Sequence, residues 1–351
     1  MSTKKSFDTV RASPSHLHWR LMRETIPQLA YDGGDVKTWQ GRLRRKVKDL
    51  LGWPQMPSER RDLNVRSLWK REHEHGTIEK IVLTMEPGSD ANAYLCVPRD
   101  AGPAYDWFIC LQGHSTGAHN SVALDFETNT RPIEVEGDRD FGVGCMRRGI
   151  AAICLEQRGF GERGETAMKS RSSRSCHEAA MHALMLGRTL IGERVYDVDR
   201  AIDYLRTRDD VNPTRIGVMG NSGGGTVSLF AAAVLPRIAW AMPSCYFCSF
   251  ADSIMAMHHC QCNYVPHILR YAGMADLMGL FAPNPVVIVS GRKDDIFPIG
   301  PARKEFRRLA EIYRAAGAPA NCRHVIGDGG HRFYAEQGWN AMLRCMNRDL
   351  P

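Results

Sequence analysis

The chain has 351 residues, 43% of them hydrophobic and 24% charged, with a formal net charge of +7 at pH 7. This composition excludes a disordered or fibrous protein, and the length allows one large core or two domains. No apolar run approaches the length of a membrane span, and residues 1–10 are polar. We therefore expect a cytoplasmic protein with no secretory leader and no membrane partner. The eleven cysteines, several inside apolar runs, indicate reduced, buried thiols rather than a disulfide framework.

Residues 1–60 predict a helical N-terminal extension that packs on a larger domain at 61–351. Apolar residues such as Trp39 and Leu43 recur at helical spacing in this extension. The basic run at 42–48 fits either a nucleic-acid patch or the solvated face of a helix. Aromatic residues do not interleave these charges as they do in single-strand binders. We therefore expect a solvated helix face and no nucleic-acid partner.

The rest of the chain predicts a sheet that begins with antiparallel strands and continues with alternating strands and helices. Such alternation is typical of a parallel sheet covered by helices on both faces. Ser175 and Glu178 form a capping-box pattern at the start of one helix. Strands are expected at 63–69, 78–85, 91–97, 107–111, 150–155, 215–219, 238–242, 286–290 and 323–326. Helices are expected before Gly149 and at 175–190, 194–207, 226–234, 301–316 and 333–346.

One pentapeptide, Gly220-Asn221-Ser222-Gly223-Gly224, matches G-x-S-x-G between a strand-like run and a helix-like run. In that context the pattern predicts a nucleophile elbow, which turns a serine sharply out of a strand and into a helix. The positions two before and two after the serine need very small side chains because the turn is crowded. A phosphate-binding loop is the alternative, but the segment lacks the Lys-Ser/Thr ending of that motif. Ser222 is therefore the candidate nucleophile.

A serine hydroxyl needs a base to accept its proton and an acid to orient that base, and both would follow it on loops after later strands. Asp294 and Asp295 follow the strand at 286–290, and we favour Asp294 because the following residues 296–298 put Asp295 at the start of the next turn. His331 follows the last strand on a glycine-flanked loop. Its rival His324 lies within that strand. The predicted catalytic triad is Ser222, His331 and Asp294.

An oxyanion hole requires preorganised backbone N–H groups. We expect the amide of Gly223, which follows the nucleophile, and that of His114, on the loop after the strand at 107–111, to supply them. The pocket candidates lie on neighbouring segments: Asn221, Arg158, Cys245 and His259. Arg158 has an alternative interpretation as a structural ion pair in an ordinary turn.

Cysteine and histidine residues gather at 245–262, which raises the question of a metal. A structural zinc site usually offers two separated C-x-x-C or H-x-x-x-H pairs, whereas this segment has C-x-C beside His258-His259. The alternatives are a metal site, a local disulfide and buried thiols beside the active site. The spacing favours the thiols, so no metal is expected.

From about Leu63 to its end, the chain resembles the α/β-hydrolase superfamily, and within it the acetyl xylan esterase and dienelactone hydrolase-like esterases. The segments that carry the resemblance are Leu111-Gln112-Gly113-His114, Gln157-Arg158-Gly159-Phe160-Gly161, 194–201, 217–225, 282–285 and 291–298. The resemblance implies a mostly parallel sheet of about eight strands flanked by helices, no cofactor and hydrolysis of small esters. True dienelactone hydrolases have a cysteine nucleophile, whereas this chain has serine, which favours an ordinary esterase.

The expected function is therefore that of a serine carboxylesterase acting on acetyl or other short acyl esters through an acyl-enzyme. A carbon–carbon bond hydrolase is an alternative on the same fold. A prolyl-oligopeptidase-like peptidase is another, although residues 1–60 are too short for the β-propeller that such enzymes carry. A binding protein that lost the chemistry is the least favoured alternative. The sequence leaves open the acyl and alcohol groups of the substrate and whether the chain forms a homo-oligomer.

Overall fold

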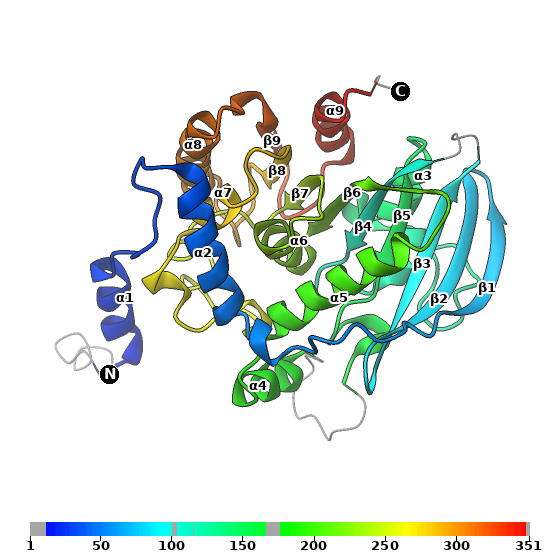
Figure 1. Cartoon of the computed structure of the whole chain (residues 1–351), viewed down its shortest axis with the longest axis horizontal. Coiled ribbons are helices and arrows are strands. Elements are labelled where there is room, and N and C mark those ends of the chain that lie inside the picture. The colour runs from blue at the N-terminus through cyan, green and yellow to red at the C-terminus, as the bar shows by residue number, and fades with distance from the viewer. Residues whose placement is uncertain (1–11, 100–103, 115, 166–175, 349–351) are drawn as a thin grey trace, which may run out of the picture.

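The computed structural model describes residues 12–99, 104–114, 116–165 and 176–348. In these residues, one nine-stranded sheet runs through the molecule (Figure 1) in the order β1-β2-β3-β5-β4-β6-β7-β8-β9. The strands are β1 (Arg66–His73), β2 (Gly76–Glu86), β3 (Ser89–Pro98), β4 (Tyr105–Leu111), β5 (Ala151–Leu155), β6 (Val211–Asn221), β7 (Trp240–Ser244), β8 (Val286–Gly291) and β9 (Cys322–Gly327). The helices are α1 (Pro14–Glu24), α2 (Val36–Leu50), α3 (Phe141–Met146), α4 (His177–Met185), α5 (Leu190–Leu205), α6 (Gly223–Val234), α7 (Met274–Gly279), α8 (Ile299–Ala315) and α9 (Ala335–Cys345).

The topology confirms the expected mostly parallel sheet. The pairs β1–β2, β2–β3 and β3–β5 are antiparallel, and all the pairs from β5–β4 to β8–β9 are parallel. Each of the nine strand ranges predicted from the sequence overlaps one strand of the structure. The resemblance implied about eight strands, one fewer than the structure has. The loops that follow β6, β8 and β9 all leave the carboxyl edge of the sheet, where α/β proteins place their sites.

Period-two alternation in the central strands separates two hydrophobic cores. Trp107, Ile109 and Leu111 of β4 face one core, whereas Phe108 and Cys110 face the other. The first core lies under α2, α5, α6, α7 and α8, and the second lies under α3 and α9. Because both faces are covered, the buried stretches of the central strands are largely apolar, as in residues 107–111 of β4 and 216–219 of β6.

The helices differ from the prediction at one junction. The predicted helix at 175–190 is wrong at its end, because α4 stops at Met185 and Gly187 follows with a φ of 72°. Glycine adopts this left-handed conformation without strain and commonly ends helices. A new helix, α5, then starts at Leu190, where the hydroxyl of Thr189 accepts a hydrogen bond of 2.9 Å from the amide of Gly192. The predicted capping residue Ser175 lies outside the described residues.

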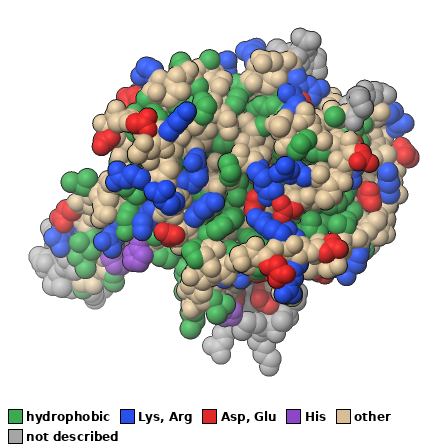
Figure 2. All heavy atoms as spheres, in the orientation of Figure 1, with side chains coloured by type: hydrophobic (Ala, Val, Ile, Leu, Met, Phe, Trp, Pro, Cys, Tyr) green, Lys and Arg blue, Asp and Glu red, His purple; other side chains and the backbone are tan. Residues whose placement is uncertain are grey.

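Helix α2 joins the N-terminal segment to the core. Leu43 and Val47 are fully buried in the first core, and the helix packs against α6. Arg42 and Arg45 are exposed on its other side. Figure 2 shows Lys and Arg side chains gathered over the part of this face where α2 lies. Arg42 and Arg45 thus lie on the outer face of an amphipathic helix, whereas Arg44 donates to the carbonyls of Ala233 and Leu280. None of the helices in the described ranges combines the length and the apolar character needed to span a bilayer.

Truncation of Leu43 tests whether α2 stabilises the core beneath the sheet. Because Leu43 has no exposed surface, Leu43→Ala should lower the free energy of unfolding by about 2–5 kcal/mol through lost burial and the cavity left behind. Arg42→Ala, one residue away on the exposed side, should change it by less than about 0.5 kcal/mol. Chemical unfolding curves of the two variants provide the measurement, and equal midpoints would contradict the packing described.

Candidate active site

Ser222 occupies a strained turn between β6 and α6. Its φ of 57° and ψ of −119° lie in a region that residues with side chains rarely adopt, as a nucleophile elbow requires. The turn brings its neighbours against the end of β4. A Cβ atom on Gly224 would lie 1.9 Å from the carbonyl oxygen of Leu111, and one on Gly220 would lie 2.6 Å from the same oxygen. Both glycines are therefore required by the close approach of two backbones.

Asp294 and His331 form a hydrogen-bonded pair. The Nδ1 of His331 lies 2.8 Å from Oδ2 of Asp294, and the other carboxylate oxygen accepts from the backbone amides of Ile296 and Phe297 at 3.0 and 3.1 Å. Burial raises the pKa of Asp294, but the hydrogen bond and charge of His331 outweigh burial and hold that pKa below its ordinary value. Asp294 is therefore a carboxylate at neutral pH. The neighbouring Asp295 is exposed.

The rival histidine has a different environment. His324 lies in β9, where its Nε2 is 3.0 Å from the hydroxyl of Ser290 and its ring packs against Phe306. Burial lowers the pKa of His324 to about 4. The structure thus brings His331, and not His324, to the carboxylate of Asp294.

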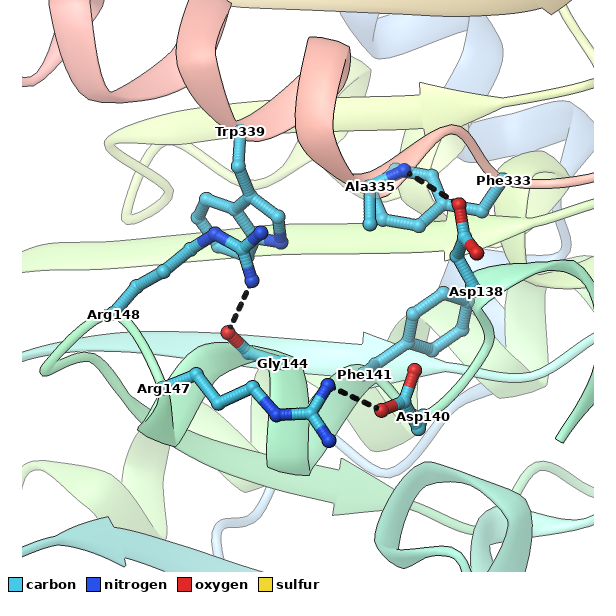
Figure 3. Close-up of a pocket in the computed structure, with 9 residues that line it drawn as sticks. All are labelled: Asp138, Asp140, Phe141, Gly144, Arg147, Arg148, Phe333, Ala335 and Trp339. Carbon is cyan, nitrogen blue, oxygen red and sulfur yellow. Dashed lines mark hydrogen bonds and ion pairs between the residues drawn. The ribbon is translucent and has the colours of Figure 1, made fainter. Parts of the chain in front are cut away.

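The loop that carries His331 is held from two sides. On one side, the backbone amides of Arg292 and Lys293 donate to the carbonyls of Gly327 and Gly329 at 2.7 and 2.8 Å. On the other side, Asp138 accepts from the backbone amide of Ala335 at 3.1 Å (Figure 3).

Asp138 also helps to line a pocket of about 280 Å³ beside this loop (Figure 3). The charged groups of this pocket already have partners: Asp138 pairs with Arg332, Asp140 lies 3.2 Å from Arg147, and Arg148 donates to the carbonyl of Gly144. These pairings leave none of the charged side chains that line the pocket without a partner in the described residues.

Ser222 and His331 are connected through the end of β7. The backbone amide of Ser222 donates to the carbonyl of Ser244 at 2.9 Å. The next residue, Cys245, has its sulfur within 4.8 Å of the ligand atoms of both Asp294 and His331. The structure has no hydrogen bond between Ser222 Oγ and His331 in the described residues, and such bonds are often long before substrate binds.

The predicted oxyanion donors lie at the serine. The amide of Gly223 is in the first turn of α6, where helical N–H groups have no intrahelical partner. Neither this amide nor that of His114 donates to any residue in the described ranges. A Cβ on Gly113 would lie 3.7 Å from Ser222 Oγ, and one on Gly223 would lie 3.0 Å from Nδ1 of His114. The β4 loop therefore covers the serine from one side.

The pocket candidates fall into different environments. Asn221 is buried and accepts a hydrogen bond of 2.8 Å from the hydroxyl of Ser244, so its oxygen is already used between two strands. Cys245 lies behind the Asp294–His331 pair, and burial together with the charge of Asp294 raises the pKa of its thiol to about 12. It is therefore a neutral thiol at physiological pH.

His259 is the pocket candidate that has a free polar atom. Its Nδ1 lies 3.1 Å from the side-chain nitrogen of Asn263, and its buried Nε2 has no partner in the described part of the chain. Burial lowers the pKa of His259 to about 4, and the charges of His114 and His331 act in the same direction. The sequence did not predict Phe297, whose ring contacts both His259 and His331 at centroid distances of 5.7 and 5.8 Å. Its position directly after the acid loop was the available signal.

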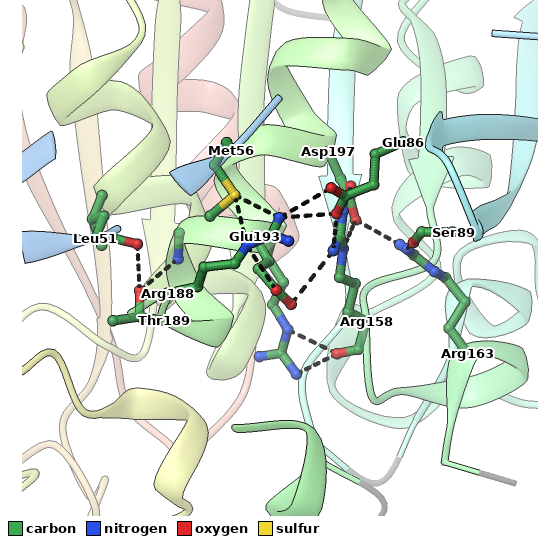
Figure 4. Close-up of polar contacts among 12 residues, drawn as sticks. Leu51, Met56, Glu86, Ser89, Arg158, Arg163, Arg188, Thr189, Glu193 and Asp197 are labelled. Carbon is green, nitrogen blue, oxygen red and sulfur yellow. Dashed lines mark hydrogen bonds and ion pairs between the residues drawn. The ribbon is translucent and has the colours of Figure 1, made fainter. Parts of the chain in front are cut away.

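Arg158 belongs to a buried ion network (Figure 4). Its guanidinium donates twice to Asp197, at 2.9 and 2.7 Å, and once to Glu86 at 2.6 Å. Asp197 is 1% exposed and also accepts from Arg163 at 2.6 Å. Burial raises the pKa of Asp197, but the charges of Arg158 and Arg163 outweigh burial and keep it below its usual range. These contacts agree with the structural ion pair that the sequence left as an alternative for Arg158.

Arg158→Met tests this structural role. The variant leaves Asp197 with one cation fewer in a buried site, so we expect a loss of about 3–5 kcal/mol in the free energy of unfolding at pH 7. Arg292→Met, which removes an exposed pair with Asp328, should lose less than about 1 kcal/mol. Because the folded pKa of Asp197 is depressed, the stabilisation is present above the ordinary Asp pKa of about 3.9 and is lost as the pH falls through the lower folded value. The difference between wild type and Arg158→Met should therefore shrink in acid. Unchanged stability with a raised KM would instead place Arg158 in substrate binding.

Comparison with known proteins places the chain in a family. The sequence model of the "Abhydrolase family" matches residues 18–325. The protein named "Putative hydrolase YtaP" from Bacillus subtilis (strain 168) is 25% identical over 294 residues, which are 83% of this chain and 93% of that protein.

Two solved structures share the fold. A "putative acetyl xylan esterase" from Bacteroides fragilis NCTC 9343 has a TM-score of 0.74 at 14% identity, covering 90% of this chain and 82% of that one. A glucuronoyl esterase from Solibacter usitatus has a TM-score of 0.63 at 14% identity, covering 90% of this chain and 93% of that one. At these identities the likeness shows the fold alone. Because the family match extends over most of the sequence, the chain belongs to the Abhydrolase family and has the α/β-hydrolase fold.

Proposed function

We propose that the protein is a serine carboxylesterase that hydrolyses esters of acetyl or other short acyl groups. The observation that carries this proposal is the strained turn at Ser222, at the same sheet edge as the Asp294–His331 pair. The strained turn directs the serine hydroxyl away from the sheet, as in a nucleophile elbow. A histidine that is hydrogen-bonded to a carboxylate is the base that such a serine needs.

In the proposed mechanism, Ser222 attacks the acyl carbon while Nε2 of His331 accepts its proton. Asp294, bonded to Nδ1, holds the imidazole in the tautomer that leaves Nε2 free and stabilises the imidazolium that forms. The amides of Gly223 and His114 donate to the oxyanion, since both lack other acceptors among the described residues. The imidazolium then protonates the leaving alcohol, and water releases the acyl group by the reverse proton path.

The surroundings of the nucleophile support a short acyl group. A Cβ on Gly223 would lie 3.1 Å from Cζ of Phe160 and 3.0 Å from the ring of His114, so two aromatic rings crowd the residue next to the serine. Little room remains there for a long acyl chain. The names of the solved esterases with this fold are a second, weaker support for ester substrates over peptides or carbon–carbon bonds.

Ser222→Ala is the direct test of the proposed nucleophile. Wild type should be labelled by a fluorophosphonate probe and should hydrolyse p-nitrophenyl acetate faster than the octanoate ester. The variant should lose labelling and about 10⁶-fold in kcat because the acyl-enzyme cannot form. Labelling without ester turnover would favour a peptide or carbon–carbon substrate. Neither labelling nor turnover in wild type would favour a binding protein.

The adjacent aspartates provide a matched pair for the proposed acid. Asp294→Asn should lower kcat by about 10⁴-fold because the amide favours the wrong histidine tautomer while keeping the shape of the side chain. Asp295→Asn, one residue away and exposed, should retain wild-type turnover. Steady-state kinetics on p-nitrophenyl acetate distinguish the two. Loss of activity in Asp295→Asn with full activity in Asp294→Asn would reverse the assignment.

A further inference from the structure

Four potential metal ligands from three separate segments meet beside the active site. They are His114 from the β4 loop, Cys176 directly before α4, and Cys260 and Cys262 from the segment after β7. Their donor atoms all lie within 4.8 Å of one another. The Nε2 of His114 is 2.9 Å from the sulfur of Cys262, and the sulfurs of Cys176 and Cys260 are 3.1 Å apart. We call these four residues the thiol–imidazole cluster.

We propose that the thiol–imidazole cluster is a structural Zn²⁺ site with three thiolates and one imidazole as its ligands. Cys₃His is one of the common structural zinc sets, and soft thiolates select zinc over hard cations. Four protein ligands fill a tetrahedral zinc and leave no position for water, so the site would be closed and structural. Binding releases the three thiol protons, and no oxidant or reductant takes part.

The dimensions of the cluster suit a tetrahedral metal better than a disulfide. Zn–S bonds of about 2.3 Å place the sulfurs about 3.8 Å apart, inside the 4.8 Å span of the cluster. The pair Cys176–Cys260 would need to separate by about 0.7 Å from its present distance. A disulfide would require the sulfurs of Cys176 and Cys260 to approach to about 2.05 Å. It would not account for the position of His114 and Cys262 beside them.

The charge balance beside the cluster supports an anionic centre there. Arg194 is 2% exposed, and its contacts in the described ranges are with a backbone carbonyl and an aromatic ring rather than with a carboxylate. Its guanidinium donates to the carbonyl of Arg158 and lies 4.0 Å over the ring of Phe160, which packs with the three cysteines of the cluster. Buried charges are normally paired. Zn²⁺ with three thiolates carries a net charge of −1, which would balance this arginine.

The zinc site would hold the loop after β4 in place. His114 would bind the metal through Nε2, while its Nδ1 faces Gly223. The backbone amide of His114 is one of the two proposed oxyanion donors. Metal binding would therefore fix the β4 loop, the start of α4 and the segment after β7 to one another. This consequence for activity rests on the proposed esterase function, whereas metal binding does not.

Residue spacing along the chain does not reveal this site. Within residues 245–262, C-x-C beside His258-His259 is a poor zinc pattern. In the structure, the histidine of the cluster is His114, which lies 148 residues before Cys262 in the chain. The third cysteine is Cys176, which lies 84 residues before Cys260. Tertiary contacts between distant segments therefore supply half of the ligand set.

Metal analysis of the full-length protein tests the proposal. Wild type purified without a chelating tag should contain about one zinc ion per chain by inductively coupled plasma mass spectrometry. Cys176→Ser, Cys260→Ser and Cys262→Ser should each contain zinc at background. Cys322→Ser, which alters a partly buried thiol outside the cluster, should keep its zinc. After zinc removal, Co²⁺ added to wild type should give the visible spectrum of a tetrahedral thiolate complex.

Thiol counting keeps the test independent of whether variants fold. Alkylation of denatured, unreduced wild type should modify all eleven cysteines. A mass two alkyl groups short, mapped to Cys176 and Cys260, would overturn the proposal in favour of a disulfide. Wild type with neither zinc nor a cobalt spectrum would also overturn it.

A fluorophosphonate assay on the same samples separates this proposal from the proposed function. Wild type that labels at Ser222 but holds no zinc refutes only the metal site, and wild type that holds zinc but does not label refutes only the esterase. If the metal site and the esterase are both present, zinc removal should lower the esterase kcat. The loss should not exceed the roughly 100- to 1,000-fold that removal of one oxyanion donor causes.

Discussion

The close contact between the turn at Ser222 and the end of β4 is the constraint on which the site depends. The serine has a φ of 57°, and this conformation persists only because the surrounding core holds both of its flanks. Leu111, at the end of β4, leaves no space for a Cβ at Gly220 or Gly224. The same contact places the β4 loop, with Gly113 and His114, directly beside the nucleophile. Strain at the elbow and the position of the proposed oxyanion donors thus have one common cause.

Buried charge organises the surroundings of this turn. Asp197 on α5 is satisfied by two arginines from the segment after β5, so it fixes that segment to a helix of the first core. Phe160, in the same segment, then packs between Arg194 and the ring of His114. An arrangement with so many buried charges is stable only if nearly every one has a partner. Arg158 therefore holds the segment that carries Phe160 against α5.

Local sequence predicted the central part of the molecule well because the information there is local. The strand, the glycines and the helix around Ser222 are contiguous, and the glycine-flanked loop of His331 follows directly from the last strand. The neighbouring aspartates could not be separated with the same certainty, since one rotation of the loop exchanges a buried carboxylate for an exposed one. The end of α4 was predicted wrongly because apolar spacing continues through Gly187, whose left-handed backbone ends the helix.

By itself, the sequence determined the order of strands and helices, the elbow and the two loops that carry the acid and the histidine. These features depend on periodicity and on glycine, which act over a few residues. Only the tertiary structure decided that Arg158 is held by Asp197, that Phe297 contacts His331 and that Cys176 meets His114. Those contacts join segments that are far apart in the chain. They depend on how the helices pack across the sheet, which no short stretch of residues encodes.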